Sequence, residues 1–326
     1  MHRHLTFDTD ILNAFTAIMQ AFHGHNTYYG IPFHNLEPAI GWTLDDGPQE
    51  TGTARRDGWP SWSWLSHSGP IRHHDAYELA LWAIPQPLSA SKVLICKPSG
   101  KNSRGNSCDY VTYEHVVPVI LSWYGGCVKS DPPVDLPLGY PLFQDLSCRW
   151  GTNYLNYWQD AFGQLEADGA VFSACDIETA LSAPGRLLVH AQTARFGLRR
   201  PTRINARNDA FWIYHSTGGF AGFIRIPTYR QSTLTHTSEE FLLISVRSRG
   251  DTDIIYEHFA AAGIRDSNQL QYTRHWELRK ISLSNPPEVW FYDPFAIVFN
   301  VMLIDRNEQT NVASRVGIGH VFLFKW

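Results

Sequence analysis

Apolar residues recur at helical spacing near the start of the chain. They lie three or four positions apart, so they share one face of a helix. This pattern predicts a first helix over Asp10–Phe22, with Thr9 or Asp8 as its N-cap. A second, shorter helix is predicted over about Asn35–Trp42, with Pro38 in its first turn. The apolar face of the first helix holds Ile11, Phe15, Ile18, Met19 and Phe22.

Beyond Trp59 the pattern changes to short apolar or alternating runs that are separated by Gly, Pro, Asn and Ser. Such runs are typical of antiparallel β-structure. Two further helices are predicted between the strands, over Tyr154–Leu165 and Asp253–Ala262. Strands are predicted near Trp59–Ser66, Glu78–Ile84, Lys92–Cys96, Val111–Trp123, Arg186–Leu198, Phe211–His215, Gly222–Ile226, Phe241–Val246, Ala296–Ile304 and Ala313–Phe324.

These elements predict an α+β fold that is mostly β: an antiparallel β-sandwich or barrel-like body with a small helical N-terminal part. We therefore expect a helical segment over residues 1–58 and a β-rich domain over 59–326. Two stretches are expected to be loop insertions in the β-rich domain. One is the polar segment near 97–106, and the other is the proline-rich segment near 130–141.

Trp62 and Trp64 are one residue apart within the run from Arg56 to Trp64. If this run is an extended strand, the two indoles lie on the same face. An aromatic pair of this kind is able to stack on a sugar or a nucleobase. The chain has 12 tryptophans, however, and indoles bury large apolar areas, so we expect these rings to fill the core of the β domain.

Composition narrows the classes of protein that fit. The chain has 326 residues, of which 44% are hydrophobic and 18% charged, as in a globular protein. A formal net charge of -4 gives no electrostatic reason to expect a nucleic-acid partner. Five cysteines without a Cys-x-x-Cys pair, together with the lack of an apolar leader or spanning segment, predict a cytoplasmic protein. One basic run is interpreted as a solvated loop, with phosphate binding as the alternative: Arg195, Arg199, Arg200, Arg203 and Arg207.

No pattern for a catalytic, cofactor or metal site stands out. The closest histidine clusters, His73-His74-Asp75 and His23-x-His25, lack companions at a metal-ligand spacing. The Gly-x-Ser-x-Gly motif of hydrolases does not occur, and scattered carboxylates alone do not define a glycosidase. Gly317-Ile318-Gly319 lies within a predicted strand, unlike a dinucleotide loop. We therefore expect no catalytic, cofactor-binding or metal-binding residues.

Several segments, in order along the chain, resemble the region that follows the signalling domain of fungal heterokaryon-incompatibility (HET) proteins. They include Arg3–Phe15, Tyr29–Trp42, Leu187–Ala194 and Gly219–Ile226. The run Arg56-Asp57-Gly58-Trp59-Pro60-Ser61-Trp62-Ser63-Trp64 is similar to a signature of that region. The residues that match family motifs, all expected to be scaffold, are Arg56, Gly58, Trp59, Pro60, Ser61, Trp62, Ser63, Trp64, Gly219, Gly222, Asn300, Arg315, Gly317 and Gly319.

The motif that opens the HET domain, Tyr-x-Ala-Leu-Ser-Tyr-x-Trp-Gly, has no counterpart in the chain. The resemblance therefore implies a non-enzymatic accessory module in fungal nonself recognition and programmed cell death. Such a module is either a truncated family member or a partner of a full-length HET-type protein. The alternatives are a carbohydrate-binding or carbohydrate-active β-sandwich protein and, in keeping with TIR-like relatives, a nucleotide-hydrolysing activity.

Overall fold

The computed structural model forms two compact units, each built from separate stretches of the chain. The first unit comprises Met1–Trp42, Thr51–Gly69 and His73–Gln192, and the barrel unit comprises Thr43–Glu50, Pro70–Arg72 and Thr193–Trp326. The structure describes residues 10–24, 27–33, 36–44, 54–73, 76–78, 80–85, 93–96, 172–191, 193–201, 207–216, 218–234, 237–247, 270–272, 290–292 and 298–322.

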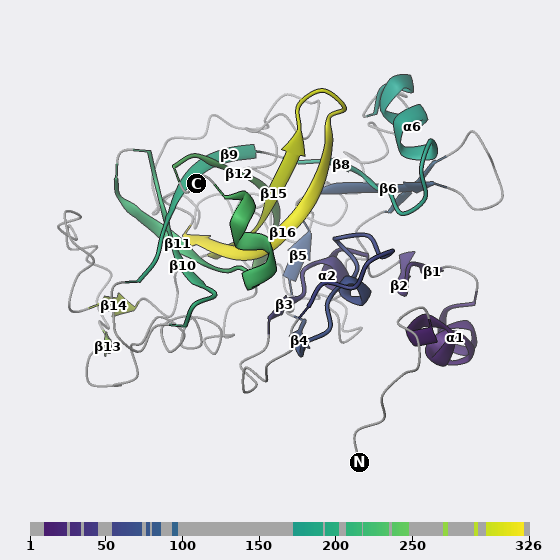
Figure 1. Ribbon diagram of the computed structural model, residues 1–326, viewed down its shortest axis with the longest axis horizontal. Helices are drawn as coiled ribbons and strands as arrows, with labels where there is room; N and C mark the ends of the chain where they lie inside the picture. The colour runs from purple at the N-terminus through teal and green to yellow at the C-terminus, as the bar shows by residue number, and fades with distance from the viewer. Residues whose placement is uncertain are drawn as a thin grey trace, which may run out of the picture. The chain divides into compact units, whose positions relative to one another are not determined.

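Six antiparallel strands form a closed barrel in the barrel unit (Figure 1). They pair in the order β15-β16-β11-β10-β9-β12, and β12 pairs in turn with β15, which closes the ring. This arrangement confirms the predicted fold class, mostly β with a barrel-like body. The strands are β9 (Thr193–Arg199), β10 (Ala210–Tyr214), β11 (Phe220–Arg225), β12 (Glu239–Arg247), β15 (Val298–Asn307) and β16 (Val312–Phe322).

The barrel core is rich in aromatic side chains. Every strand contributes to it a side chain that is at most 2% exposed, and two of these rings, Phe196 and Phe241, meet edge to face with centroids 5.6 Å apart. The alternate residues of β10 and β11, among them Trp212 and Phe223, are buried as well. Strands buried on both faces do not alternate in polarity, which explains why these strands are nearly continuous apolar runs in the sequence. The core side chains include Phe196, Phe211, Ile213, Ile224, Phe241, Phe299 and Val321.

Glycines allow β11 and β16 to approach closely. A Cβ on Gly222 would lie 1.9 Å from the backbone oxygen of His320, and a Cβ on Gly319 would lie 2.7 Å from the backbone oxygen of Phe223. Neither oxygen can move away, because both belong to the paired strands. These positions therefore require glycine, as at the sharp bends of a small barrel.

Three smaller elements are described in the rest of the barrel unit. Strands β3 (Thr43–Leu44) and β4 (Ile71–Arg72) form a two-stranded antiparallel ribbon. A 3₁₀ helix, η4, spans Thr228–Thr233. Strands β13 (Leu270–Tyr272) and β14 (Trp290–Tyr292) form a short parallel pair.

The first unit combines helices with short strands. Its three-stranded antiparallel sheet has the order β7-β6-β8. Ser173 and Asp176 form a reciprocal capping box at the start of helix α6, which is a common way for a helix to begin. The elements are α1 (Asp10–His23), β1 (Thr27–Tyr28), β2 (Ile31–Pro32), α2 (Leu36–Ile40), η2 (Trp64–Ser66), β5 (Ala76–Glu78), β6 (Leu81–Pro85), β7 (Val93–Cys96), α6 (Ala174–Leu181) and β8 (Leu188–His190).

Most of the predicted elements that fall on described residues are present. The helices predicted over Asp10–Phe22 and Asn35–Trp42 are α1 and α2. The long strand predicted over Arg186–Leu198 is two strands, β8 and β9. Helix α6 was not predicted. The strand predicted over Trp59–Ser66 is wrong, because the chain forms turns and η2 there.

Other predictions lie outside the described residues. These are the strand over Val111–Trp123, the helices over Tyr154–Leu165 and Asp253–Ala262, and the insertions near 97–106 and 130–141. The division into 1–58 and 59–326 stays a prediction. None of the described helices is long and apolar enough to cross a membrane.

Candidate functional site

We define residues 54–69, which contain the tryptophan-rich signature, as the motif loop. Ser63 determines its local structure. The Ser63 backbone is extended (φ -75, ψ 138), and its Oγ accepts a hydrogen bond from the N–H of Leu65 at 3.2 Å, so Ser63 caps η2. The same hydroxyl donates to the carbonyl of Tyr29 at 3.0 Å. The chain therefore turns where a strand was predicted, and Trp62 and Trp64 do not form a same-face pair on a strand.

Trp62 lies at the centre of the motif loop's contacts. It is only 8% exposed, and its Nε1–H donates to the carbonyl of Gly185 at 2.8 Å. Its ring stacks on Tyr28, with centroids 5.7 Å apart and planes 15° apart. Its own carbonyl accepts a hydrogen bond from Nε1 of Trp42 at 3.0 Å. Through its indole and its carbonyl, Trp62 thus contacts Tyr28, Trp42 and Gly185, which are far from it in the sequence.

The Tyr28 hydroxyl strengthens the same junction. It accepts a hydrogen bond from the N–H of Gly185 at 3.0 Å and donates to the carbonyl of Arg186 at 3.4 Å. Burial is the main cause that raises the pKa of Tyr28 above its ordinary value. Gly185 has φ +77, and a Cβ there would meet Pro60 Cγ at 2.6 Å. Glycine is therefore required at the point where this turn packs on the motif loop.

The other signature residues also make internal contacts. The Arg56 guanidinium donates to the carbonyls of Leu65 and His67, and its backbone N–H bonds to the carbonyl of Ser66. Trp64 Nε1 donates to the carbonyl of Gly30 at 3.4 Å. Two further contacts complete the set: Trp59 packs edge to face on Tyr29 at 6.2 Å, and the carbonyl of Ser61 accepts a hydrogen bond from Ser66 at 3.4 Å.

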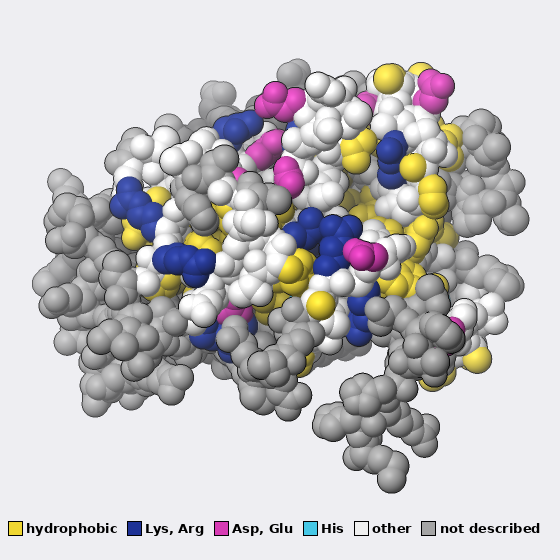
Figure 2. Space-filling model, viewed as in Figure 1, with side chains coloured by type: hydrophobic (Ala, Val, Ile, Leu, Met, Phe, Trp, Pro, Cys, Tyr) yellow, Lys and Arg dark blue, Asp and Glu magenta, His cyan; other side chains and the backbone are white. Residues whose placement is uncertain are grey.

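The motif loop is exposed at Ala54, Ser68 and most of residues 55–58, which we call its tip. Arg55, Asp57 and Gly58 are exposed, and a Cβ on Gly58 would meet nothing within 4 Å. Figure 2 shows hydrophobic side chains at the surface of the same unit, between α6 and the β1–β2 hairpin. The structure therefore presents a charged tip on a loop whose aromatic side chains are packed inward. Arg55 and Asp57 are therefore accessible to a partner.

The motif residues of the barrel unit lie in and beside the barrel wall. Asn300 bonds to the side chains of two neighbouring strands: its Nδ2 donates to Ser245 Oγ at 2.9 Å, and its Oδ1 lies 2.9 Å from His320 Nδ1. All three residues are buried, so this row of side chains on three neighbouring strands is shielded from solvent. Burial also lowers the pKa of Arg315. Gly219 accepts a hydrogen bond from the N–H of His215 in the turn between β10 and β11.

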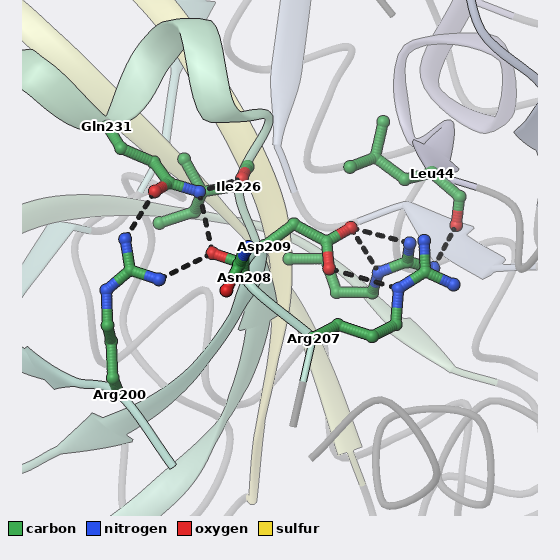
Figure 3. A network of polar contacts seen from close by, with 8 residues as sticks. Leu44, Arg200, Arg207, Asn208, Asp209, Ile226 and Gln231 are labelled. Carbon is green, nitrogen blue, oxygen red and sulfur yellow. Dashed lines mark hydrogen bonds and ion pairs between the residues drawn. The ribbon is translucent and has the colours of Figure 1, made fainter. Parts of the chain in front are cut away.

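A buried ion pair lies beside the start of β10 (Figure 3). Arg225 donates to Asp209 Oδ2 from Nε at 3.1 Å and from Nη2 at 2.6 Å, and it donates from Nη1 to the carbonyl of Leu44 at 2.9 Å. Arg207 approaches the other carboxylate oxygen of Asp209 at 3.2 Å. Arg225 is 5% exposed and Asp209 3% exposed. A guanidinium serves such a site well because its planar fork donates in several fixed directions.

The predicted basic loop is largely engaged in internal contacts. The Arg199 guanidinium lies over the Tyr214 ring at 4.5 Å. Arg200 donates to the carbonyl of Asn208 at 2.7 Å and to Gln231 Oε1 at 2.5 Å (Figure 3). Arg195 bonds to the carbonyl of Ser238, whereas Arg203 lies outside the described residues. These contacts support a role of the arginines in holding the barrel's turns.

The buried row of Ser245, Asn300 and His320 does not have the geometry of a reaction centre. Ser245 and His320 are separated by Asn300, and their burial prevents a substrate from reaching them. Within the part of the chain that the structure describes, no group of three His, Cys, Asp or Glu residues is placed to hold a metal ion.

Comparisons with known proteins return no match. No family model matches the chain, and neither the curated proteins nor the solved structures include a significant match.

Proposed function

We propose that the chain is a non-enzymatic interaction module of the HET type, which acts in fungal nonself recognition and programmed cell death. The family part of this proposal is supported by the ordered sequence resemblance. The observation that carries the interaction part is the division of the motif loop: its indoles are packed inward, and its charged tip is exposed.

The packing of Trp62 also bears on the carbohydrate alternative. A stacking platform needs an open ring face, whereas one face of Trp62 lies on Tyr28 and the residue is 8% exposed. Its indole N–H already bonds to Gly185. This residue therefore supports a structural role, and no observation favours a sugar-binding site at the motif loop.

The partner that we propose is a full-length HET-type protein in the cytoplasm. The tip offers one cation, Arg55, and one anion, Asp57, on a backbone that the interior bonds of the motif loop hold in place. A rigid support lowers the entropy lost on binding, and arginine is frequent among the residues that dominate interface energies. Binding through this tip would regulate the partner without any reaction on this chain.

The test combines a cell assay with a binding assay. The chain is expressed in a filamentous fungus, alone and together with a full-length HET-type protein, and hyphal death is counted. We expect no death from the chain alone, and an altered death rate on co-expression. The purified proteins are expected to bind each other, and the double variant Arg55→Ser/Asp57→Ser is expected to lose binding at an unchanged melting temperature.

The matched control changes charge elsewhere on the same unit. Glu178 in α6 is exposed, so Glu178→Ser is expected to leave binding unchanged. Cell death caused by the chain alone would contradict an accessory role. Release of nicotinamide from NAD by the purified chain would contradict the non-enzymatic part of the proposal.

A further inference from the structure

The β3–β4 ribbon is too short to be stable by itself. It has two residue pairs, Thr43 with Arg72 and Leu44 with Ile71. Even a longer isolated two-stranded hairpin is only marginally stable in water. Contacts from elsewhere in the barrel unit must therefore hold the ribbon in place.

Arg225 of β11 provides such a contact. Its Nη1–H donates to the carbonyl of Leu44 across 181 positions of sequence, while Nε and Nη2 hold Asp209. Asp209 is itself fixed, because its carbonyl accepts a hydrogen bond from the N–H of Ile226 at 2.8 Å. A buried guanidinium is tolerated when its charge is paired and its donors are used. The same group that pairs with Asp209 thus fastens the ribbon to the barrel.

The ribbon also closes the segment that contains the motif loop. Leu44 and Ile71 are paired, and residues 54–69 lie between them in the sequence. Trp42, which immediately precedes β3, donates its indole N–H to the carbonyl of Trp62. If β3 detaches, the outer ends of this segment at Leu44 and Ile71 are released, and the bonds between Ala54 and Ser68 at the neck of the motif loop must then carry the whole entropy cost of closing it.

We propose that Arg225 is a positioning residue through which the barrel controls the order of the motif loop. With the Arg225–Leu44 bond in place, the ribbon holds the ends of the loop together. Without it, the ribbon opens and the loop loses order while the barrel stays folded. This device does not depend on the identity of the partner and goes beyond the proposed function.

The test compares two variants of the full chain by hydrogen–deuterium exchange. Arg225→Lys keeps a positive charge beside Asp209, but an ammonium group lacks the fork that reaches the carboxylate and Leu44 together. The control, Arg207→Gln, removes the other guanidinium from Asp209 and leaves the bond to Leu44 in place. Exchange is measured in peptides from 36–44, 54–72, 210–225 and 312–322.

In Arg225→Lys we expect exchange in residues 43–44 and 54–72 to accelerate about tenfold or more, the effect of losing one hydrogen bond from a charged group. Strands β10, β11 and β16 should keep their protection, and Arg207→Gln should leave residues 54–72 unchanged. Unchanged exchange in 54–72 of Arg225→Lys would overturn the proposal. So would an equal acceleration in the barrel strands, because Arg225 would then support the barrel alone.

A measurement on the unaltered protein provides a second test that does not rely on a variant that folds. Amides of the ribbon and of the motif loop are followed by hydrogen exchange at increasing urea concentrations below the unfolding transition. If the ribbon controls the loop, the two sets share one opening free energy and one urea dependence. Separate opening free energies would overturn the proposal.

Discussion

Replacing Trp62 by phenylalanine tests whether this indole holds the first unit together. Phenylalanine keeps an aromatic ring that can stack on Tyr28, but it removes the N–H that donates to Gly185 at 2.8 Å. It also removes the second, fused ring from a position that is 8% exposed. Trp62→Phe is therefore expected to destabilise the first unit through two separable losses.

The size of the effect follows from these contacts. Leaving the partly buried carbonyl of Gly185 without its donor, beneath a side chain that is itself buried, costs about 1 to 3 kcal/mol. The apolar area of the lost ring adds about 1 kcal/mol. We therefore expect Trp62→Phe to lower the free energy of unfolding by about 2 to 4 kcal/mol, a large part of the stability of a typical domain.

The matched control is Trp59→Phe, the same chemical change three positions earlier. Trp59 is half-buried and meets Tyr29 edge to face at 6.2 Å, and its N–H makes no hydrogen bond with the described residues. Its loss should cost less than about 1 kcal/mol. Both variants are compared in urea titrations followed by far-UV circular dichroism, with the urea slope unchanged. Equal costs for the two variants, or a cost below about 0.5 kcal/mol for Trp62→Phe, would refute the reasoning.

Three further predictions concern the barrel and Tyr28. Gly222→Ala should destabilise the barrel by about 3 kcal/mol or more, because the new Cβ meets the backbone oxygen of His320; thermal unfolding measures this, and an unchanged melting temperature would contradict it. Asn300→Ala should cost about 2 to 4 kcal/mol in urea titrations, because it leaves Ser245 and His320 without its amide, and a cost near zero would show that the row contributes nothing. The pKa of Tyr28 is raised above 10.0, so above pH 10 the folded chain binds more protons than the unfolded chain, and the stability that Tyr28 contributes below pH 10 is lost as pH rises through the raised pKa. The urea midpoint of Tyr28→Phe should therefore fall less steeply above pH 10 than that of the unaltered chain, and identical slopes would contradict this.

The barrel strands were predictable from the sequence, whereas their closure into a ring was not. Apolar runs such as Phe211–His215 and Phe241–Val246 indicate strands because each run is short and bounded by turn residues. The pairing of β12 with β15 depends on a register between residues about 60 positions apart, which periodicity does not contain. The sequence pattern therefore fits a sandwich and a barrel equally well, and only the strand pairing distinguishes the two folds.

The motif loop shows why a strand prediction failed. Two tryptophans separated by one residue fit the alternation of a strand, but the residue between them is Ser63. A serine that caps a helical turn competes with extended structure, and Pro60 before it favours a turn. The Ser-x-x-Ser spacing of Ser63 and Ser66 was a local signal for this turn. The bonds from Trp62 to Gly185 and from Arg225 to Leu44 join distant segments, so no local signal predicts them.

The ring formed by the six barrel strands limits how this unit can associate with other chains. Along the paired stretches of the ring, each strand exchanges main-chain hydrogen bonds with a neighbour on either side. An open sheet recruits foreign chains by adding them to its border, the route that leads both to peptide capture and to fibrils. The paired stretches of the ring offer no such template, so the apolar residues there are protected from aggregation of that kind. A protein that recognises this ring must do so through its side chains and its connecting turns.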